Sequence, residues 1–456
     1  MDEVEIADER KLFGTNGIRG VVGSGMDVRL ALEIGMSIGT LIHGRVVIGT
    51  DQRTSGQMLK EAVISGLLAT GNDVTDIGLA PTPSVQYAVA KSDAAGGVVV
   101  TASHNPPEFN GIKVIDSDGT EMHFSKELEI ERIYFEKAQK TASWDKTGYL
   151  TADSEANRRY IRGVKNLLDR RAIAAADLKV VVDCANGAGS AVTPSLLSDL
   201  EVNIVTLNAQ PHGSFPGHPS EPTPENLATL MKTVKSVNAD FGLAHDGDAD
   251  RTIFVDDRGG YIMGDKSFAL LAGYTVSKYP DSTVVSTVAT SDVVSDMVVR
   301  FGGKVVQTRV GSPVVARKMK EIGAIFGGEE NGGLIFAKHQ YCRDGAMTAG
   351  LMTEMVAQQG SLSSLLESVP TYHQVKLKTS CPNESKRKVT EQLVKQLSGK
   401  KLDLTDGIKV FEGTDWVLIR QSGTEPIFRV FSQARDKEKA ESLASEYFEI
   451  LKAIIS

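Results

Sequence analysis

The chain has 456 residues, of which 41% are apolar and 24% charged, and its formal net charge is −8. This length exceeds what one hydrophobic core usually supports, so several domains are predicted. The acidic balance argues against nucleic-acid binding, and no apolar run is long enough for a membrane helix. The N-terminus "MDEVEIADERK" does not resemble a secretory signal, and the three cysteines show neither disulfide nor zinc spacing. We therefore expect a cytoplasmic protein with small-molecule partners; a homo-oligomer stays open.

Three segments along the chain share one pattern of a short β-branched run, a polar loop and a helical stretch. They read "GRVVIGTDQRTSGQMLKEAVISGLLATG", "LKVVVDCANGAGSAVTPSLLSDL" and "STVVSTVATSDVVSDMVVRFGG". Buried β-branched runs that alternate with helices indicate βαβ units and a mostly parallel sheet. The sequence therefore predicts a repeated α/β domain.

The C-terminal part follows a different pattern. The stretches "IKVFEG", "WVLIRQSG" and "IFRVFSQA" are close-spaced predicted strands, and a long amphipathic helix follows from about Lys437 to Ile455. Strands in sequence followed by a helix indicate a small α+β domain. Polar stretches suggest four domains, over residues 1–153, 154–256, 257–369 and 370–456. The Pro-rich segment "QPHGSFPGHPSEPTPENL" is predicted to be a loop of the second.

The stretch "VVVTASHNPPEFNGIKV" ends a predicted strand in Ser103 and His104, with Lys113 a little further along. A tight turn is the simple explanation, because Ser, Asn and Pro are common there. A hydrolase nucleophile would occupy a G-x-S-x-G elbow, which is absent from this stretch. Together with the aspartate-rich loop described next, the stretch favours phosphoryl transfer through Ser103. Lys113 or Arg19 would steady the charge on the reacting oxygens.

The stretch "AHDGDADRTIFVDD" places Asp246, Asp248 and Asp250 between two predicted strands. Three carboxylates in five residues can converge on a hard divalent cation such as Mg²⁺. An EF-hand is excluded, because its sixth position would be Arg251 instead of Gly and its twelfth Asp257 instead of Glu. A solvated acidic turn is the alternative. Arg251 argues against that turn, because a cation beside the carboxylates suits an anion that bridges to a metal.

Two further loops carry groups suited to a sugar phosphate. In "FGGEENGGLIF", Glu329 and Asn331 could bond sugar hydroxyls, although an ordinary charged loop is an alternative. In "RQSGTEPIFRV", a guanidinium pair, two hydroxyls and a flexible backbone suit a phosphate dianion. The residues concerned are Arg420, Ser422, Gly423, Thr424 and Arg429. A hairpin with surface arginines is the alternative there.

Taken together, these motifs resemble the α-D-phosphohexomutase family, which interconverts sugar 1-phosphates and 6-phosphates. The matching stretches occur in family order over nearly the whole chain: "FGTNGIRG", "TASHNPPEFNGIK", "FPGHPSEPTPENL", "DGDADR", "GEENGG" and "RQSGTEPIFRV". The resemblance implies three related mixed α/β domains and a smaller C-terminal α+β domain around a central cleft. It also implies Mg²⁺ as cofactor and a hexose 1,6-bisphosphate as intermediate and activator.

The resemblance also implies roles for single residues. Ser103 would carry a phosphoryl group and, with Asp246, Asp248 and Asp250, ligate the metal, next to Arg251. Arg19 and Lys113 are implied candidates for proton transfer, and His104 matches the motif with a structural role as the alternative. Glu329 and Asn331 would contact sugar hydroxyls. The distal phosphate would bind Arg420, Ser422, Gly423, Thr424 and Arg429.

The identity of the sugar is less strongly indicated. Asn331 stands where many relatives have serine, Gly333 where several have histidine, and Gln433 where an acidic residue often follows. "FGTNGIRG" looks closest to phosphoglucosamine mutases, so glucosamine phosphate is favoured, with mannose and glucose phosphates as alternatives. A non-catalytic sugar-phosphate sensor on the same fold is a further alternative. It would be expected to have lost Ser103 or a metal-loop aspartate, and this chain keeps them all.

Overall fold

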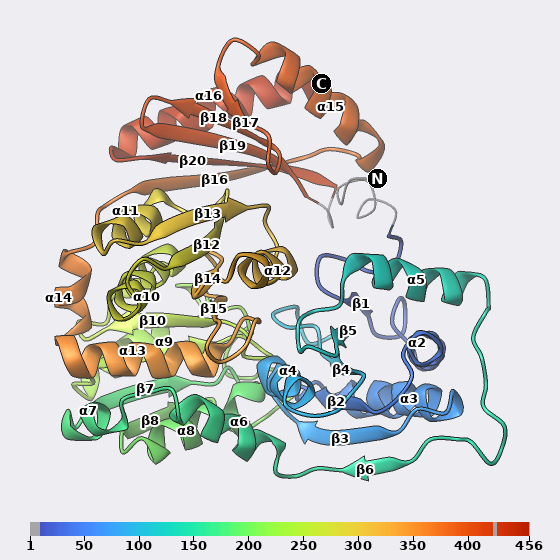
Figure 1. The fold of residues 1–456 in the computed structure, drawn as a ribbon. Helices are drawn as coiled ribbons and strands as arrows, with labels where there is room; N and C mark the ends of the chain where they lie inside the picture. The colour runs from blue at the N-terminus through green and yellow to red at the C-terminus, as the bar shows by residue number, and fades with distance from the viewer. Residues whose placement is uncertain (1–9, 423–425, 456) are drawn as a thin grey trace.

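The structure is a computed structural model that describes residues 10–422 and 426–455. Its chain forms four sheets in succession, each with its own helices, and we number these bodies domains I to IV (Figure 1). The predicted α/β architecture, with three mixed α/β units and a smaller C-terminal α+β unit, is confirmed. The limits chosen between the domains stay a prediction.

Domain I holds a six-stranded sheet in the order β1-β5-β4-β2-β3-β6. Its strands are β1 (Ile18–Val21), β2 (Val46–Thr50), β3 (Val74–Leu79), β4 (Gly96–Val100), β5 (Phe109–Asp116) and β6 (Leu150–Ala152). Its helices are α2 (Val28–Leu41), α3 (Gly56–Ala69), α4 (Thr82–Ala90) and α5 (Phe124–Phe135).

Domain II holds a five-stranded sheet in the order β11-β10-β9-β7-β8. Its strands are β7 (Lys179–Asp183), β8 (Asn203–Leu207), β9 (Phe241–His245), β10 (Thr252–Asp256) and β11 (Tyr261–Ile262). Its helices are α6 (Ala156–Lys165), α7 (Arg170–Ala175), α8 (Thr193–Asp199) and α9 (Ala228–Ser236), with a 3-10 turn at Ala188–Ala191.

Domain III holds a four-stranded sheet in the order β13-β12-β14-β15. Its strands are β12 (Thr283–Thr287), β13 (Lys304–Thr308), β14 (Phe326–Gly328) and β15 (Leu334–Phe336). Its helices are α10 (Gly264–Lys278), α11 (Asp292–Arg300), α12 (Ser312–Ile322), α13 (Gly345–Gln359) and α14 (Leu362–Glu367).

Domain IV holds a five-stranded antiparallel sheet in the order β16-β20-β19-β18-β17. Its strands are β16 (His373–Ser380), β17 (Lys401–Asp403), β18 (Ile408–Glu412), β19 (Asp415–Gln421) and β20 (Ile427–Ala434). Helix α15 (Asn383–Gln396) follows β16, and the predicted long helix is α16 (Lys437–Ile455).

Domains I, II and III repeat one topology. In each, the first strand of a parallel trio lies in the middle, as β2, β7 and β12 do, and the next two strands pair on either side of it. A fourth strand then turns back antiparallel to the third. The stretches that contain Ser103, the three aspartates and Glu329 all lie at that same turn, between the third parallel strand and its antiparallel partner. The repeat thus gives three predicted functional loops equivalent positions.

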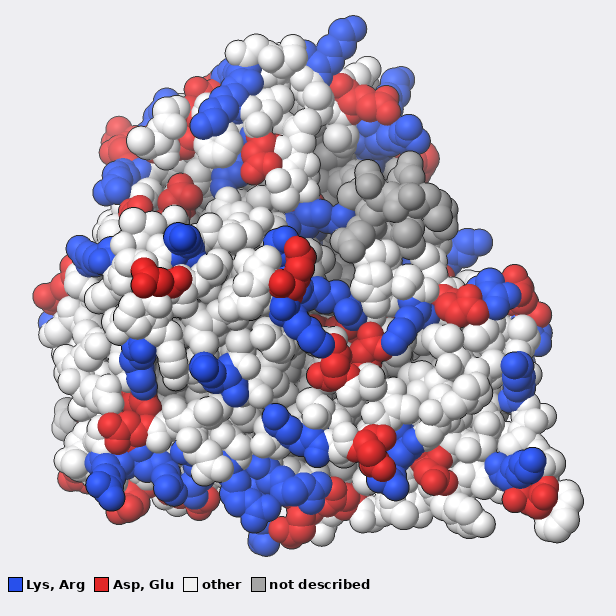
Figure 2. Space-filling view, in the orientation of Figure 1, with Lys and Arg blue, Asp and Glu red and all other residues white. Residues whose placement is uncertain are grey.

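Ion pairs also join domain I to domain III. Charged side chains of both signs gather near the middle of the face drawn in Figure 2, around the junction of these domains. Arg317 of α12 lies 3.2 Å from a carboxylate oxygen of Asp116, and the Nζ of Lys320 lies 2.5 Å from Asp118. Because these pairs are partly exposed, we assign them a modest energetic weight.

The three cysteines and the lengths of the helices complete the description of the fold. Cys184, Cys342 and Cys381 are all free and buried, in agreement with the absence of a disulfide pattern. Among the described residues, no helix is both long and apolar enough to cross a membrane.

Candidate active site

Ser103 lies in the turn between β4 and β5 with an unusual backbone conformation. Its φ angle is 52°, in the left-handed region that residues with a side chain rarely adopt. The residue is 1% exposed. Such strain persists only where neighbouring contacts hold it, and it is common at functional sites.

Arg53 provides those contacts, and the sequence analysis did not single it out. Its guanidinium pairs with Asp51 at 3.1 Å and donates to the carbonyl oxygens of Ser103 at 2.8 Å and Pro106 at 2.6 Å. The side chains of Arg53 and Asp51 are fully buried. The signal in the sequence was an Asp and an Arg directly after a β-branched strand, a place where buried charges need partners.

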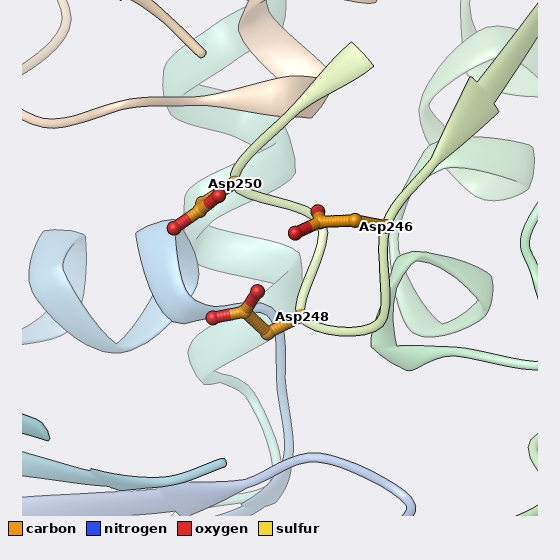
Figure 3. A group of neighbouring side chains, drawn as sticks. All are labelled: Asp246, Asp248 and Asp250. Carbon is orange, nitrogen blue, oxygen red and sulfur yellow. The ribbon is translucent and has the colours of Figure 1, made fainter. Parts of the chain in front are cut away.

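The three aspartates of the loop between β9 and β10 converge, as Figure 3 shows. One carboxylate oxygen from each lies within 4.8 Å of the other two. The hydroxyl of Ser103 donates to Asp246 Oδ2 at 2.8 Å. Gly247 permits this close approach, because a Cβ there would lie 2.4 Å from the carbonyl oxygen of Ser103. The fold therefore brings two predicted loops from different domains into contact.

The electrostatics of this cluster favour a bound cation. Burial, then Asp250 and Asp248, raises the pKa of Asp246 well above its usual range. Burial acts in the same direction on Asp248, but Lys113, whose Nζ is 2.6 Å away, helps to keep the pKa of that carboxyl below its usual value. The Oδ1 atoms of Asp248 and Asp250 are buried and lack a hydrogen-bond partner within the described residues. A divalent cation with oxygen ligands would satisfy both, so this donor set fits Mg²⁺.

Arg19 and Arg251 approach the same centre from domains I and II. Arg19 donates to Asn105 Oδ1 at 2.9 Å, and burial lowers the pKa of its guanidinium while Asp248 counteracts that shift. Arg251 is buried and donates to Glu221 Oε1 at 3.0 Å. Glu221 belongs to the Pro-rich loop, a segment that the sequence analysis noted without assigning this residue a role.

His104 lies beside the serine hydroxyl. Its Nδ1 is 3.3 Å from Ser103 Oγ and its Nε2 is 3.6 Å from Glu221. Burial, followed by the charges of Arg251 and Arg19, lowers the pKa of His104 to about 2. The imidazole is therefore neutral near pH 7, when it can accept or donate one hydrogen bond at each nitrogen.

Arg343 joins the metal loop to the sugar loop and was also missed by the sequence analysis. Its Nη2 donates to Asp250 Oδ2 at 2.6 Å, and its Nη1 lies 3.6 Å from Glu329 Oε2. All three side chains are buried. Arg343 just precedes Asp344, the N-cap of α13. No local pattern marks such an arginine, because its partners lie on other loops.

The predicted sugar loop lies against the metal loop. The backbone N–H of Thr252 donates to Gly332 O at 3.0 Å. Glu329 is buried, which raises its pKa, and it accepts a hydrogen bond from the Gly311 N–H at 3.0 Å. Asn331 accepts one from the N–H of Gly333 at 3.0 Å, so it also shapes its own loop.

The predicted phosphate loop belongs to domain IV, between β19 and β20. Arg420 and Arg429 are directly opposite in the register of these strands. The Nε of Arg420 donates to Asp406 at 2.7 Å, and Lys386 donates to the carbonyl of Ser422 at 2.6 Å. Two other predicted residues, Gly423 and Thr424, lie outside the described residues. Arg420 and Arg429 thus lie on strands of domain IV, whereas Ser103 lies between two strands of domain I.

Comparison with known families agrees with this geometry. Four consecutive models of the phosphoglucomutase/phosphomannomutase family match the chain. They are the alpha/beta/alpha domains I, II and III over residues 10–141, 158–260 and 263–372, and the C-terminal domain over residues 381–450. The chain belongs to this family. The expected family and the expected class of enzyme are therefore confirmed.

Individual relatives cover nearly the full length. A phosphoglucomutase/phosphomannomutase of Thermococcus kodakarensis is 45% identical, covering 96% of this chain and 97% of the relative. A probable phosphoglucosamine mutase of Pyrococcus abyssi is 43% identical and covers 98% of each. The crystal structure of a phosphoglucomutase/phosphomannomutase family protein from Burkholderia thailandensis superimposes with a TM-score of 0.87 at 27% identity, covering 97% of both chains.

A more distant structure shares the fold alone. It is the N-acetylphosphoglucosamine mutase of Aspergillus fumigatus, in complex with GlcNAc-6P and magnesium. Its identity is 16% and its TM-score 0.62, over 100% of this chain and 98% of that one.

Proposed function

We propose that this phosphohexomutase interconverts hexosamine or hexose 6-phosphates and 1-phosphates through a phosphorylated Ser103. The observation that carries the proposal is the contact of the Ser103 hydroxyl with Asp246 at 2.8 Å, inside a cluster of three buried carboxylates. A serine held in a strained conformation beside a cation-binding cluster suits phosphoryl transfer, because that reaction depends on positioning and charge neutralisation.

Asp246, Asp248 and Asp250 would hold Mg²⁺, together with an oxygen on Ser103. The proposal is supported by the all-oxygen donor set and by the magnesium in the related mutase complex. The ion would supply positive charge next to the transferring phosphoryl group.

The surrounding residues have separate tasks in this proposal. Lys113 and Arg19 would stabilise charge on the reacting oxygens, and both are candidates for proton transfer; Lys113 is supported by its pair with Asp248 of the metal loop, and Arg19 by its bond to Asn105 of the Ser103 loop. The neutral imidazole of His104, 3.3 Å from Ser103 Oγ, is a further candidate. Arg251, whose Nε lies 4.0 Å from Asp246 and 3.9 Å from Asp250, would add positive charge beside the metal loop.

The remaining loops would bind the substrate. Glu329 and Asn331 would contact sugar hydroxyls, and the distal phosphate would bind the domain IV loop. That loop comprises Arg420, Ser422, Gly423, Thr424 and Arg429. In the first half-reaction, the phosphoryl group of Ser103 passes to the sugar phosphate. The resulting 1,6-bisphosphate turns over, and its other phosphate returns to Ser103. One distal site must then serve both orientations.

Among sugars, we propose glucosamine phosphate as the preferred substrate. The relatives support this in part, because one is named a probable phosphoglucosamine mutase and another a phosphoglucomutase/phosphomannomutase. Glucose and mannose phosphates are the alternatives. We also propose a cytoplasmic location, as for a sugar-phosphate enzyme with free thiols.

The experiment is a turnover assay with purified protein and glucosamine, glucose and mannose 1-phosphates, alongside the intact mass of the protein. We expect 6-phosphate formation, fastest with glucosamine 1-phosphate, and a phosphoryl group on Ser103. Ser103→Ala should lose turnover while Ser24→Ala, an exposed serine of the same domain, keeps it. Binding of all three sugars without turnover would instead identify a sensor.

A further inference from the structure

Asp406 occupies the loop between β17 and β18 and contacts two domains at once. Its Oδ2 accepts a hydrogen bond from Arg420 Nε at 2.7 Å, within domain IV. The same oxygen accepts one from the backbone N–H of Val310 at 2.8 Å, which belongs to domain III. The side chains of Asp406 and Arg420 are only 16% and 17% exposed, so this bridge is largely shielded from water.

The domain III end of the bridge is itself connected to the sugar loop. Val310 and Gly311 are consecutive residues between β13 and α12. The N–H of Val310 donates to Asp406, and the N–H of Gly311 donates to Glu329 at 3.0 Å. One short backbone segment is therefore bonded both to the acid of the sugar loop and to the acid beside Arg420.

Gly407 explains how Asp406 comes so close to the arginine. Its φ angle is +80°, and a Cβ there would lie 2.5 Å from the carbonyl oxygen of Ile419 and 3.0 Å from the Cα of Arg420. Only glycine fits both the conformation and the space. The turn is thus packed directly on the strand that carries Arg420, which sets the position of the carboxylate.

We propose that Asp406 is a positioning residue that orients Arg420 for the distal phosphate by anchoring its guanidinium to the Val310–Gly311 segment. A carboxylate bonded to Nε fixes the plane of the Arg420 guanidinium and turns its two terminal amino groups to the phosphate, which can be bound by such a pair of parallel N–H donors. This inference rests on the proposed function. It adds a residue that touches no substrate and acts through Arg420.

A purely structural role for Asp406 is the competing explanation. The junction of domains III and IV already has such an anchor: Asp292 accepts hydrogen bonds from Trp416 Nε1 at 2.9 Å and from Gln433 Nε2 at 2.7 Å. Asp406 differs because its partner in domain IV is a predicted ligand of the substrate. The experiment must therefore separate orientation of Arg420 from stability of the junction.

The test measures catalytic efficiency in both directions, calorimetric affinity for glucosamine 1-phosphate, and melting temperature. The variants are Asp406→Asn, Arg420→Ala, the double variant and Asp406→Glu. Asp415→Asn is the matched control, because Asp415 lies on the same strand as Arg420 and its side chain has no hydrogen bond or ion pair with another described residue. We expect Asp406→Asn to lose about tenfold in affinity and efficiency, mainly through KM, as for loss of a charge-assisted hydrogen bond. Asp406→Glu should recover part of this loss, and Asp415→Asn should match the wild type.

The double variant distinguishes orientation of Arg420 from a purely structural role of Asp406. If Asp406 acts through Arg420, adding Asp406→Asn to Arg420→Ala should cost less than about twofold, because the group it orients is already gone. An equal loss in both backgrounds, or a lower melting temperature with unchanged affinity, would overturn the inference. Wild-type protein that binds glucosamine 1-phosphate without turning it over would contradict the proposed function instead, since the affinity comparison does not depend on turnover.

Discussion

Domains II and III share one hydrophobic core, whereas domain IV has a core of its own. Buried side chains from Tyr160 to Val369, such as Phe241, Phe268 and Met352, form one continuous cluster across domains II and III. The buried side chains of domain IV, which include Phe428 and Tyr447, form a separate cluster. A small cluster that includes Val288 and Trp416 links it to domain III.

This difference indicates that domains II and III form one rigid body, whereas domain IV can adjust its position more easily. The metal loop and Glu329 lie on bodies that cannot shift without disrupting a common core. The phosphate loop lies on a body held to its neighbour by a small apolar contact and a few polar bonds, as domains that move relative to each other are. In the proposed reaction the reacting phosphate needs fixed geometry, and the distal phosphate must be bound in two substrate orientations.

The largest expected effect is a loss of kcat on substitution in the metal loop. Asp248→Asn removes a buried carboxylate, and we expect kcat to fall at least about a thousandfold because charge neutralisation at the phosphoryl group is impaired. The control is Asp199→Asn, because Asp199 forms a partly exposed ion pair with Lys165. Both kcat values are measured at saturating magnesium. Activity near that of the wild type would remove the metal loop from the proposed mechanism.

A somewhat smaller effect on catalysis is expected for the phosphate loop of domain IV. Arg420→Ala should lower kcat/KM for the 1-phosphate and the 6-phosphate alike, by about 3 kcal/mol, as for a charged bidentate partner. Phosphorylation of Ser103 should be unchanged. Arg387→Ala, on α15 with a 92% exposed side chain, is the control. A variant that loses one direction and spares the other would show that the loop is not a shared distal site.

The two cores can be compared directly by cavity-forming substitutions. Leu271 and Leu443 are 0% and 2% exposed, in the shared core and in the domain IV core. Leu271→Ala and Leu443→Ala should each cost about 3 kcal/mol of unfolding free energy. Hydrogen exchange should speed up across domains II and III for the first and within domain IV for the second. Uniform acceleration over all domains in both variants would contradict separate cores.

The smallest expected effect is a pH dependence near the junction of domains III and IV. Burial, then Glu330, raises the pKa of Asp265 to about 7. The unfolded chain ionises this carboxyl near its ordinary pKa, whereas the folded protein keeps it protonated up to about pH 7. The free energy of unfolding therefore falls as the pH rises from the ordinary pKa of the carboxyl through about pH 7. Between about pH 6 and about pH 8 the wild type should lose about 1 kcal/mol more than Asp265→Asn. Parallel stability curves for the two proteins would show that Asp265 keeps an ordinary pKa.

The local chemistry of each loop could be predicted from sequence because its residues are contiguous. Asp246, Asp248 and Asp250 lie within five positions of one loop and do form one cluster. The α16 helix also matches its predicted limits, because apolar periodicity is a local property of the sequence. The repeated βαβ pattern and the C-terminal run of strands followed by a helix indicated the α/β and α+β units, and the resemblance to the family implied their four-domain arrangement.

The partners of those loops depended on tertiary structure. Arg53, Glu221, Arg343 and Asp406 each act on a residue far away in the sequence. Only Arg53 has a local signal, its place with Asp51 directly after a β-branched strand, and that signal does not name its partner. Likewise, only the folded chain brings Ser103 within 2.8 Å of Asp246, from another domain. The sequence by itself determined which groups are present and how neighbouring ones are spaced. The packing of the domains decided which of them meet, because burial and pairing of charges depend on contacts between segments that are distant along the chain.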